Sequence, residues 1–66
     1  MQLENGKTYI TRQGYKITIR KLDTSQGDAR YPFIGNNGFT FTDTGRWTIY
    51  NKHDNDLISE YKPVVM

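Results

Sequence analysis

Cysteine is absent from this chain of 66 residues. Without it, disulfide frameworks and thiolate metal sites, the usual supports of small secreted domains, are excluded. Long apolar runs are also missing, because no stretch approaches the roughly 18 residues that a membrane-spanning helix needs. The N-terminal stretch MQLENGKTYI lacks the apolar segment of a signal peptide. These absences predict a complete cytoplasmic protein without a membrane partner.

Helical patterning is a further absence, since no stretch combines 3.6-residue periodicity with capping residues. The chain instead alternates apolar and polar residues with a period of two, which is typical of β-strands. Such runs predict five or six short strands, at residues 7–12, 15–21, 31–34, 39–42, 46–50 and 56–61.

Glycine and asparagine mark the turns between these runs. Gly14, the GNNG stretch at 35–38 and the DTG stretch at 43–45 predict tight turns, because these residues tolerate positive φ. Two polar loops are expected, from Asp23 to Arg30 and over residues 51–56. The second has room for one helical turn capped by Asp54 or Asn55.

The predicted architecture is all-β, a small curved antiparallel sheet or an SH3-like barrel, since curvature protects the edges of a short sheet. We expect a single β domain over residues 1–62 and an apolar C-terminal tail over 63–66. At this size folding buries only about 60% of the chain's surface. A homodimer is therefore raised as a hypothesis, because association would add buried area.

Aromatic residues, 14% of the chain, dominate the predicted core. Alternation along the last two aromatic runs assigns Phe39, Phe41, Trp47 and Ile49 to the interior. Tyr50 has the opposite parity to Trp47, so its ring is expected outside. The same argument places Tyr15, Ile17 and Ile19 on one sheet face, and turns either Leu57 or Ile58 inward.

Catalytic and metal-binding patterns are weak. His53 is the single histidine and lies beside Asp54 and Asp56, but no nucleophile motif accompanies it. The HDND stretch departs from a calcium loop, because glycine is missing and Glu60 follows too closely. We therefore expect no enzymatic activity, no catalytic residues, no metal and no cofactor.

Charge is only mildly basic, with nine Lys and Arg against seven Asp and Glu and a net charge of +2. By parity, Lys16, Thr18 and Arg20 share one face of a strand. Basic residues interleaved with aromatic rings on a sheet can bind single-stranded nucleic acid. A solvated basic face is the alternative interpretation. The cations available to such a face are Arg12, Lys16, Arg20, Lys21, Arg30, Arg46 and Lys52.

The order of short motifs along the chain forms a wider pattern. The stretches GKTYITRQGYKITI, YPFIG, TDTGRW and DLISEY follow one another over nearly the whole sequence. This pattern resembles that of small uncharacterised accessory proteins encoded by tailed bacteriophages. Trp47 stands where tyrosine is commoner in that class.

The resemblance implies a non-enzymatic accessory protein that acts by binding in the host bacterial cytoplasm. Its expected partner is a host protein, such as a defence enzyme, or a small nucleotide signal. Single-stranded nucleic-acid binding stays open as an alternative. Exposed tyrosines would give rigid contact area and arginines forked hydrogen bonding. The candidate partner-binding residues are Tyr31, Tyr50, Arg12, Arg30, Arg46 and Lys52.

Overall fold

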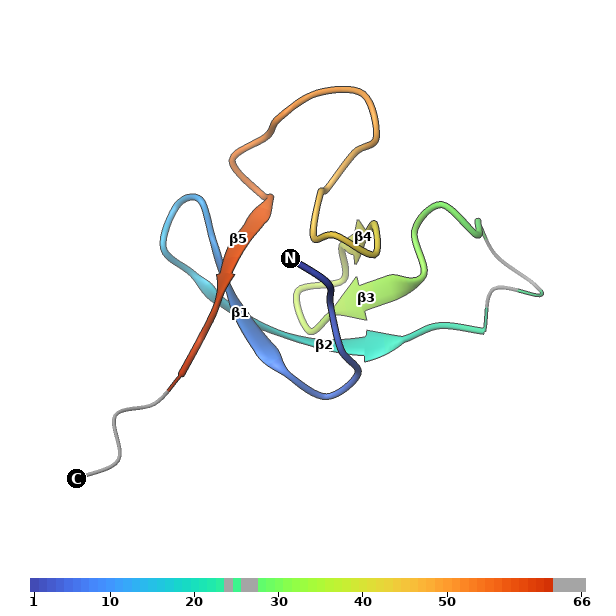
Figure 1. Cartoon of the computed structure of the whole chain (residues 1–66), viewed down its shortest axis with the longest axis horizontal. Coiled ribbons are helices and arrows are strands. Elements are labelled where there is room, and N and C mark those ends of the chain that lie inside the picture. Colours follow the sequence, from blue (N-terminus) through green and yellow to red (C-terminus); the bar gives the residue numbers. More distant parts are fainter. Residues whose placement is uncertain (24, 26–27, 63–66) are drawn as a thin grey trace.

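The computed structural model describes residues 1–23, 25 and 28–62. It contains five antiparallel strands in the spatial order β4-β3-β2-β1-β5, and no helix within the described residues (Figure 1). The strands are β1 (Thr8–Thr11), β2 (Lys16–Lys21), β3 (Phe33–Gly35), β4 (Thr40–Phe41) and β5 (Leu57–Glu60). The predicted all-β class is confirmed. The predicted tail at 63–66 and positions 24, 26 and 27 of the predicted loop lie outside the described residues.

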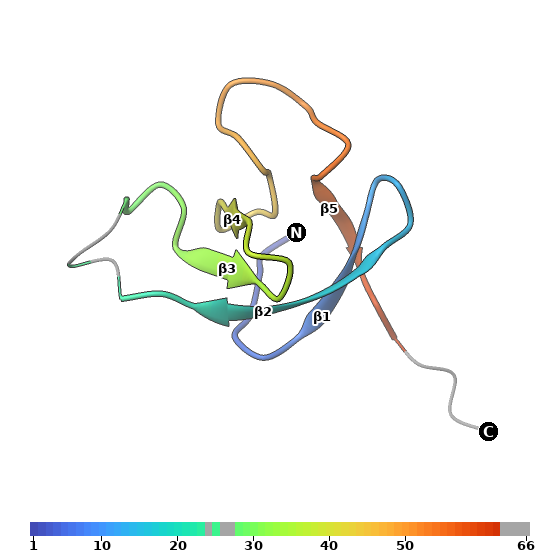
Figure 2. The same cartoon turned by 180° about the vertical axis from the view of Figure 1, so that it is seen from behind.

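Strand β2 is the centre of the sheet, because its two halves pair with different neighbours. Its first half pairs with β1, with Thr18 opposite Thr8, while its second half pairs with β3, with Ile19 opposite Gly35. The sheet therefore bends along β2 and curls into a half-barrel, as both views show (Figures 1 and 2). The described residues contain no helix long and apolar enough to cross a membrane.

The core lies inside this curve and is small. Phe41, Tyr9 and Ile19 are its largest fully buried side chains. The Tyr9 hydroxyl accepts a hydrogen bond of 2.9 Å from the Glu4 N–H, so its polar end is satisfied. The buried apolar residues are Leu3, Tyr9, Ile17, Ile19, Phe33, Phe41 and Leu57, with Trp47 packed against them.

Half of the aromatic core prediction is wrong. Phe41 is buried and Trp47 is partly buried, but Phe39 and Ile49 are exposed. Tyr15, expected beside Ile17, is 66% exposed. Tyr15 and Phe39 have the inward parity, yet they lie in turns just beyond the paired residues, where no strand covers them. Parity therefore fixes the direction of a side chain but not whether other chain segments cover it.

The structure of β5 shows which of Leu57 and Ile58 turns inward, a point that the sequence left open. Leu57 turns inward and is 4% exposed, whereas Ile58 is 50% exposed. The register of β5 against β1 shifts between Ile10 and Thr11, which places Thr11 opposite Leu57. Such an irregularity is common at the edge of a curled sheet.

The predicted strand at residues 46–50 is also wrong, because these residues, all of them described, form no strand. Their backbone donors are taken by side chains. The Trp47 N–H donates to the Asp56 carboxylate at 2.9 Å, and the Ile49 N–H donates to the Tyr31 hydroxyl at 3.1 Å. The Arg46 and Tyr50 N–H groups likewise donate to the hydroxyls of Thr42 and Thr48, so few donors remain for a sheet ladder.

The half-barrel is closed by loop contacts instead of a sixth strand. The Leu57 N–H donates to the Gly45 carbonyl at 2.7 Å, and the Leu3 N–H donates to the Asp43 carbonyl at 2.8 Å. Gly45 has φ of 95°, and a Cβ there would lie 2.9 Å from the Leu57 carbonyl oxygen. The turn after β4 thus joins the start of β5 only because residue 45 has no side chain.

We expect the Gly45→Ala substitution to destabilise the protein by about 2–3 kcal/mol, because it adds a backbone clash to left-handed strain. Gly6→Ala is the matched control, since Gly6 has φ of 83° but nothing within 4 Å of its added Cβ. It should cost only the strain, about 1 kcal/mol. Urea unfolding of both variants measures the difference, and equal losses would contradict a closure at Gly45.

Candidate binding site

The six predicted partner-binding residues do not form one site. Tyr31 and Arg30 lie together, with the guanidinium 5.9 Å from the centre of the ring. Asp28 pairs with Arg30 at 2.8 Å and raises the pKa of that guanidinium, and the hydroxyl of Tyr50 adds to the effect. Tyr50 is 73% exposed, so its predicted position outside the core is confirmed.

The other three predicted residues lie elsewhere. Arg12 and Lys52 line a shallow pocket of about 200 Å³ with His53 and Asp54. Arg46 stands apart in the turn after β4, half-buried, where its backbone bonds to that of Thr42. The structure therefore divides the six residues into one group of three, one pair and a single residue.

Asp56 holds the long connection between β4 and β5 in place. This residue is 3% exposed, and its carboxylate accepts hydrogen bonds from the N–H groups of Trp47 at 2.9 Å and His53 at 3.0 Å. The Arg12 guanidinium lies 3.4 Å away. The predicted helical turn capped by Asp54 or Asn55 is wrong, because residues 51–56, all of them described, contain no helix. Asp56 instead binds the backbone of this loop through the His53 N–H.

The protonation of Asp56 follows from these contacts. Burial raises the pKa of its carboxyl, but the hydrogen bonds from the backbones of His53 and Trp47 and the contact with Arg12 outweigh burial. The net result is a pKa below the ordinary value. Asp56 is therefore charged at neutral pH and fixes the connection through charge-assisted hydrogen bonds.

A second exposed aromatic surface lies where the turn between β1 and β2 approaches the turn between β3 and β4. Tyr15 and Phe39 are 66% and 41% exposed there and line a hollow of about 410 Å³. We call it the aromatic hollow. Its lining residues are Thr11, Gln13, Tyr15, Lys16, Ile17, Asn36, Asn37, Phe39 and Asn55.

Local hydrogen bonds fix the two turns that carry the rings. The Tyr15 N–H donates to the Thr11 hydroxyl at 3.0 Å, and the Phe39 N–H donates to the Asn37 side-chain carbonyl at 3.1 Å. Gly38 between Asn37 and Phe39 has φ of 88°. Short turns closed in this way hold the aromatic side chains in place without covering them.

Phe39 is also supported from behind by two further rings. Its ring meets Trp47 edge-on at 6.1 Å, and Trp47 stacks on His53 at 4.3 Å. The Nδ1 atom of His53 accepts a hydrogen bond from the Asn55 N–H at 3.1 Å, which fixes the ring within its loop. His53 is exposed in its loop, and its stacking on Trp47 makes it part of the support of the aromatic hollow.

Charge is sparse in the aromatic hollow. Among the described residues that line it, Lys16 is the only charged one. Four lining residues, Gln13, Asn36, Asn37 and Asn55, carry side-chain amides, which both donate and accept hydrogen bonds. The chemistry offered is therefore two ring faces surrounded by amides, with a cation at the rim.

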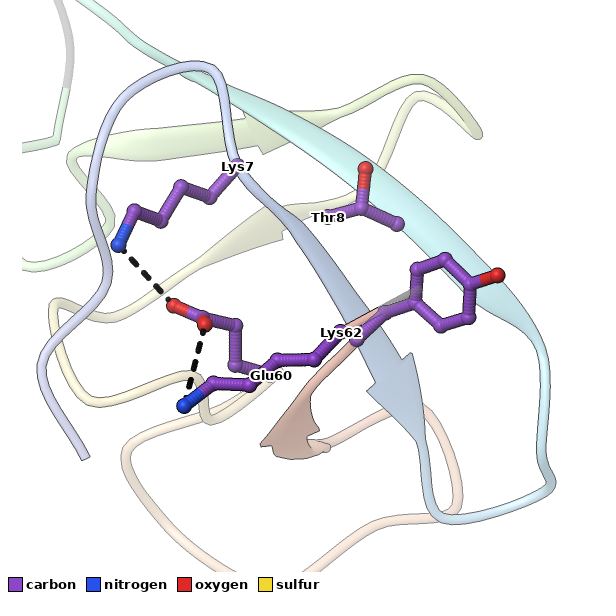
Figure 3. Close-up of a pocket in the computed structure, with 5 residues that line it drawn as sticks. Lys7, Thr8, Glu60 and Lys62 are labelled. Carbon is purple, nitrogen blue, oxygen red and sulfur yellow. Dashed lines mark hydrogen bonds and ion pairs between the residues drawn. The ribbon is translucent and has the colours of Figure 1, made fainter. Parts of the chain in front are cut away.

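A second pocket of about 420 Å³ lies between the start of β1 and the end of β5. Figure 3 shows Lys7 and Lys62 reaching toward the Glu60 carboxylate, while Thr8 and the Tyr61 ring point away from it. Lys7 pairs with Glu4 at 2.6 Å and with Glu60 at 3.2 Å. Both carboxylates raise the pKa of Lys7. The charged groups of this pocket compensate one another, which leaves little attraction for a charged ligand.

Among the described residues, no group of three or more histidine, cysteine or acidic side chains could hold a metal ion. Comparison with protein-family models, with curated proteins and with solved structures finds no match to this chain. Function must therefore be argued from the surfaces themselves.

The Asp56→Asn substitution should lower the free energy of unfolding at pH 7 by about 2 kcal/mol, because it weakens three charge-assisted contacts. The folded-state pKa of Asp56 is lowered, so its contribution is fully present above the unfolded pKa of about 4. The contribution is lost as pH falls further. Thermal unfolding of both proteins from pH 7 to pH 2 should show a difference that shrinks below about pH 4.

Asp54→Asn serves as the control, because Asp54 is exposed in the same loop. Its effect should stay within about 0.5 kcal/mol, as for most surface changes. If the two variants had equal stability at pH 7, Asp56 would not be the anchor of this connection.

Proposed function

We propose that this protein is a non-enzymatic accessory binding protein of the phage type, and that it binds a segment of a host protein in the aromatic hollow. The phage assignment is taken from the resemblance in motif order along the chain. The single observation that supports the site is the pair of exposed rings, Tyr15 and Phe39, held at the open end of the half-barrel.

A polypeptide suits this surface better than a nucleotide does. Rigid aromatic side chains are the commonest anchors at protein interfaces, because they bury large areas at a low cost in side-chain entropy. The surrounding amides can bond to the N–H and C=O groups of a peptide backbone. A nucleotide signal would also bring several phosphate charges, and among the described lining residues only Lys16 could meet them.

The expected partner is a bacterial protein that takes part in defence, consistent with an accessory role during infection. A specific interface needs about 800 Å² from each partner, and we expect the hollow to be the centre of such an interface. A homodimer of this chain stays a prediction, which light scattering can test.

A pull-down from bacterial lysate tests the proposal with the whole chain as bait. We expect the Tyr15→Ala/Phe39→Ala double variant to lose the protein that the unchanged bait retains. Removal of two central aromatic anchors should weaken binding about 30-fold or more. Both residues are exposed, so circular dichroism should show that the variant stays folded.

Tyr50→Ala is the matched control, because it removes a ring that is 73% exposed and does not line the hollow. This variant should retain the partner. Loss on Tyr50→Ala with retention on the double variant would move the site to the Tyr31 and Arg30 group. A second experiment measures the melting temperature of the protein with each of a panel of nucleotides. A rise in melting temperature of several degrees with one nucleotide would reject the protein partner.

A further inference from the structure

The outward side of the sheet has an unusual composition. Strand pairing places Ile10 opposite both Lys16 and Ser59, and Ile34 opposite both Arg20 and Thr40. Directly opposed residues point to the same side of a sheet. We call this side the outer sheet face. Its strand residues are Thr8, Ile10, Lys16, Thr18, Arg20, Ile34, Thr40 and Ser59.

Side-chain contacts confirm that these residues share one face. The Thr8 and Thr18 hydroxyls are 2.7 Å apart. The Lys16 ammonium lies 4.3 Å from the centre of the Tyr61 ring, which extends the face beyond the end of β5. Lys16, Thr18 and Arg20 are exposed. The parity predicted for these three residues of β2 is thus correct.

Among the described strand residues of this face there are two cations, four hydroxyl groups and no carboxylate. The chain contains seven acidic residues. Five of them, at positions 23, 28, 43, 54 and 56, belong to the connections outside the strands, and Glu4 and Glu60 pair with Lys7. The positive charge of Lys16 and Arg20 is therefore not compensated on the outer sheet face.

We propose that the outer sheet face binds the phosphate backbone of single-stranded nucleic acid without sequence preference. Lysine, arginine, serine and threonine are side chains that contact phosphate oxygens. Asparagine, glutamine and carboxylates, which together with arginine and lysine read base edges, do not occur among the strand residues of this face. Lys16 and Arg20 lie about 13 Å apart along β2, so they reach different phosphates of one strand.

A single strand fits this surface better than a duplex does. The face is the convex side of a curled sheet, on which β2 crosses from the β1 hairpin to β3 (Figure 2). A duplex is stiff, with a persistence length of about 150 base pairs, so its phosphates do not follow a curved surface as small as this one. A flexible single strand can instead follow the curve and place its phosphates over both cations.

Fluorescence polarisation with a labelled oligothymidylate, measured from 20 to 200 mM salt, tests the proposal. Two phosphate contacts on a single strand contribute about 1.4 to the slope of log affinity against log salt. We expect the Lys16→Gln/Arg20→Gln variant to lose that part of the slope and to bind about tenfold more weakly at 0.1 M salt.

The Arg30→Gln/Lys52→Gln variant is the matched control, because it removes the same charge from the connections outside the sheet. Its binding should change less than twofold. Equal weakening of the two double variants would overturn the proposal, since binding would then reflect net charge alone. No binding at 20 mM salt, or tighter binding of a duplex of the same length, would also overturn it.

This inference is independent of the proposed host-protein site. Lys16 borders both surfaces, so Arg20→Gln alone, which does not touch the aromatic hollow, separates them. It should weaken oligothymidylate binding and leave the host partner bound. The Tyr15→Ala/Phe39→Ala variant should lose the host partner and keep its affinity for oligothymidylate. If Arg20→Gln left oligothymidylate binding unchanged, the outer sheet face would not be the nucleic-acid site.

Discussion

The arrangement of the aromatic side chains depends on one buried carboxylate. Asp56 draws the N–H groups of Trp47 and His53 to itself and meets Arg12 from the end of β1. Without that acceptor, a long connection rich in polar residues would have no fixed course over the sheet. Because the Asp56 carboxylate holds the Trp47 backbone, Trp47 packs against the core and its ring supports that of Phe39. The position of this carboxylate therefore determines where the two rings lie.

A chain this short has too few strand residues to close a barrel. Backbone hydrogen bonds between loop residues therefore join the turn after β4 to the start of β5 and to the N-terminal segment. Gly45 accepts from Leu57, and Asp43 accepts from Leu3, so the N-terminus and the turn after β4 replace a sixth strand. These contacts do not cover the two hairpin turns that carry Tyr15 and Phe39. The aromatic hollow exists there because the core residues are too few to fill the space between the hairpin turns.

Much of the fold could be predicted from the sequence, because its signals are local. Alternation located all five strands, and Gly14 and the GNNG stretch located two of the turns. The strand predicted at 46–50 failed for a nonlocal reason, since the carboxylate that captures its backbone is Asp56 and the hydroxyl is that of Tyr31. Nothing in the stretch RWTIY itself reveals those partners.

The candidate site was harder to predict than the fold. Parity gave the correct direction for Tyr15 and Phe39, but only the three-dimensional path of the chain shows that the other described segments leave them exposed. The outer sheet face was easier, because Lys16, Thr18 and Arg20 alternate within one strand. Surfaces made by one strand can be found in a sequence, whereas a hollow between two turns and a distant loop depends on tertiary structure.

The pairing of β1 with β5 joins segments from opposite ends of the described chain, whereas the other three strand pairs are neighbours in sequence. Hairpins form in microseconds, but a contact that closes a loop of this length must wait for the intervening chain to order. The topology therefore predicts the order of assembly. The pairs β1–β2, β2–β3 and β3–β4 form first, and β5 pairs with β1 last. On this view the last strand to arrive is also the first to detach in transient opening, and such local opening would expose Leu57 and Tyr9 to proteases before the rest of the domain.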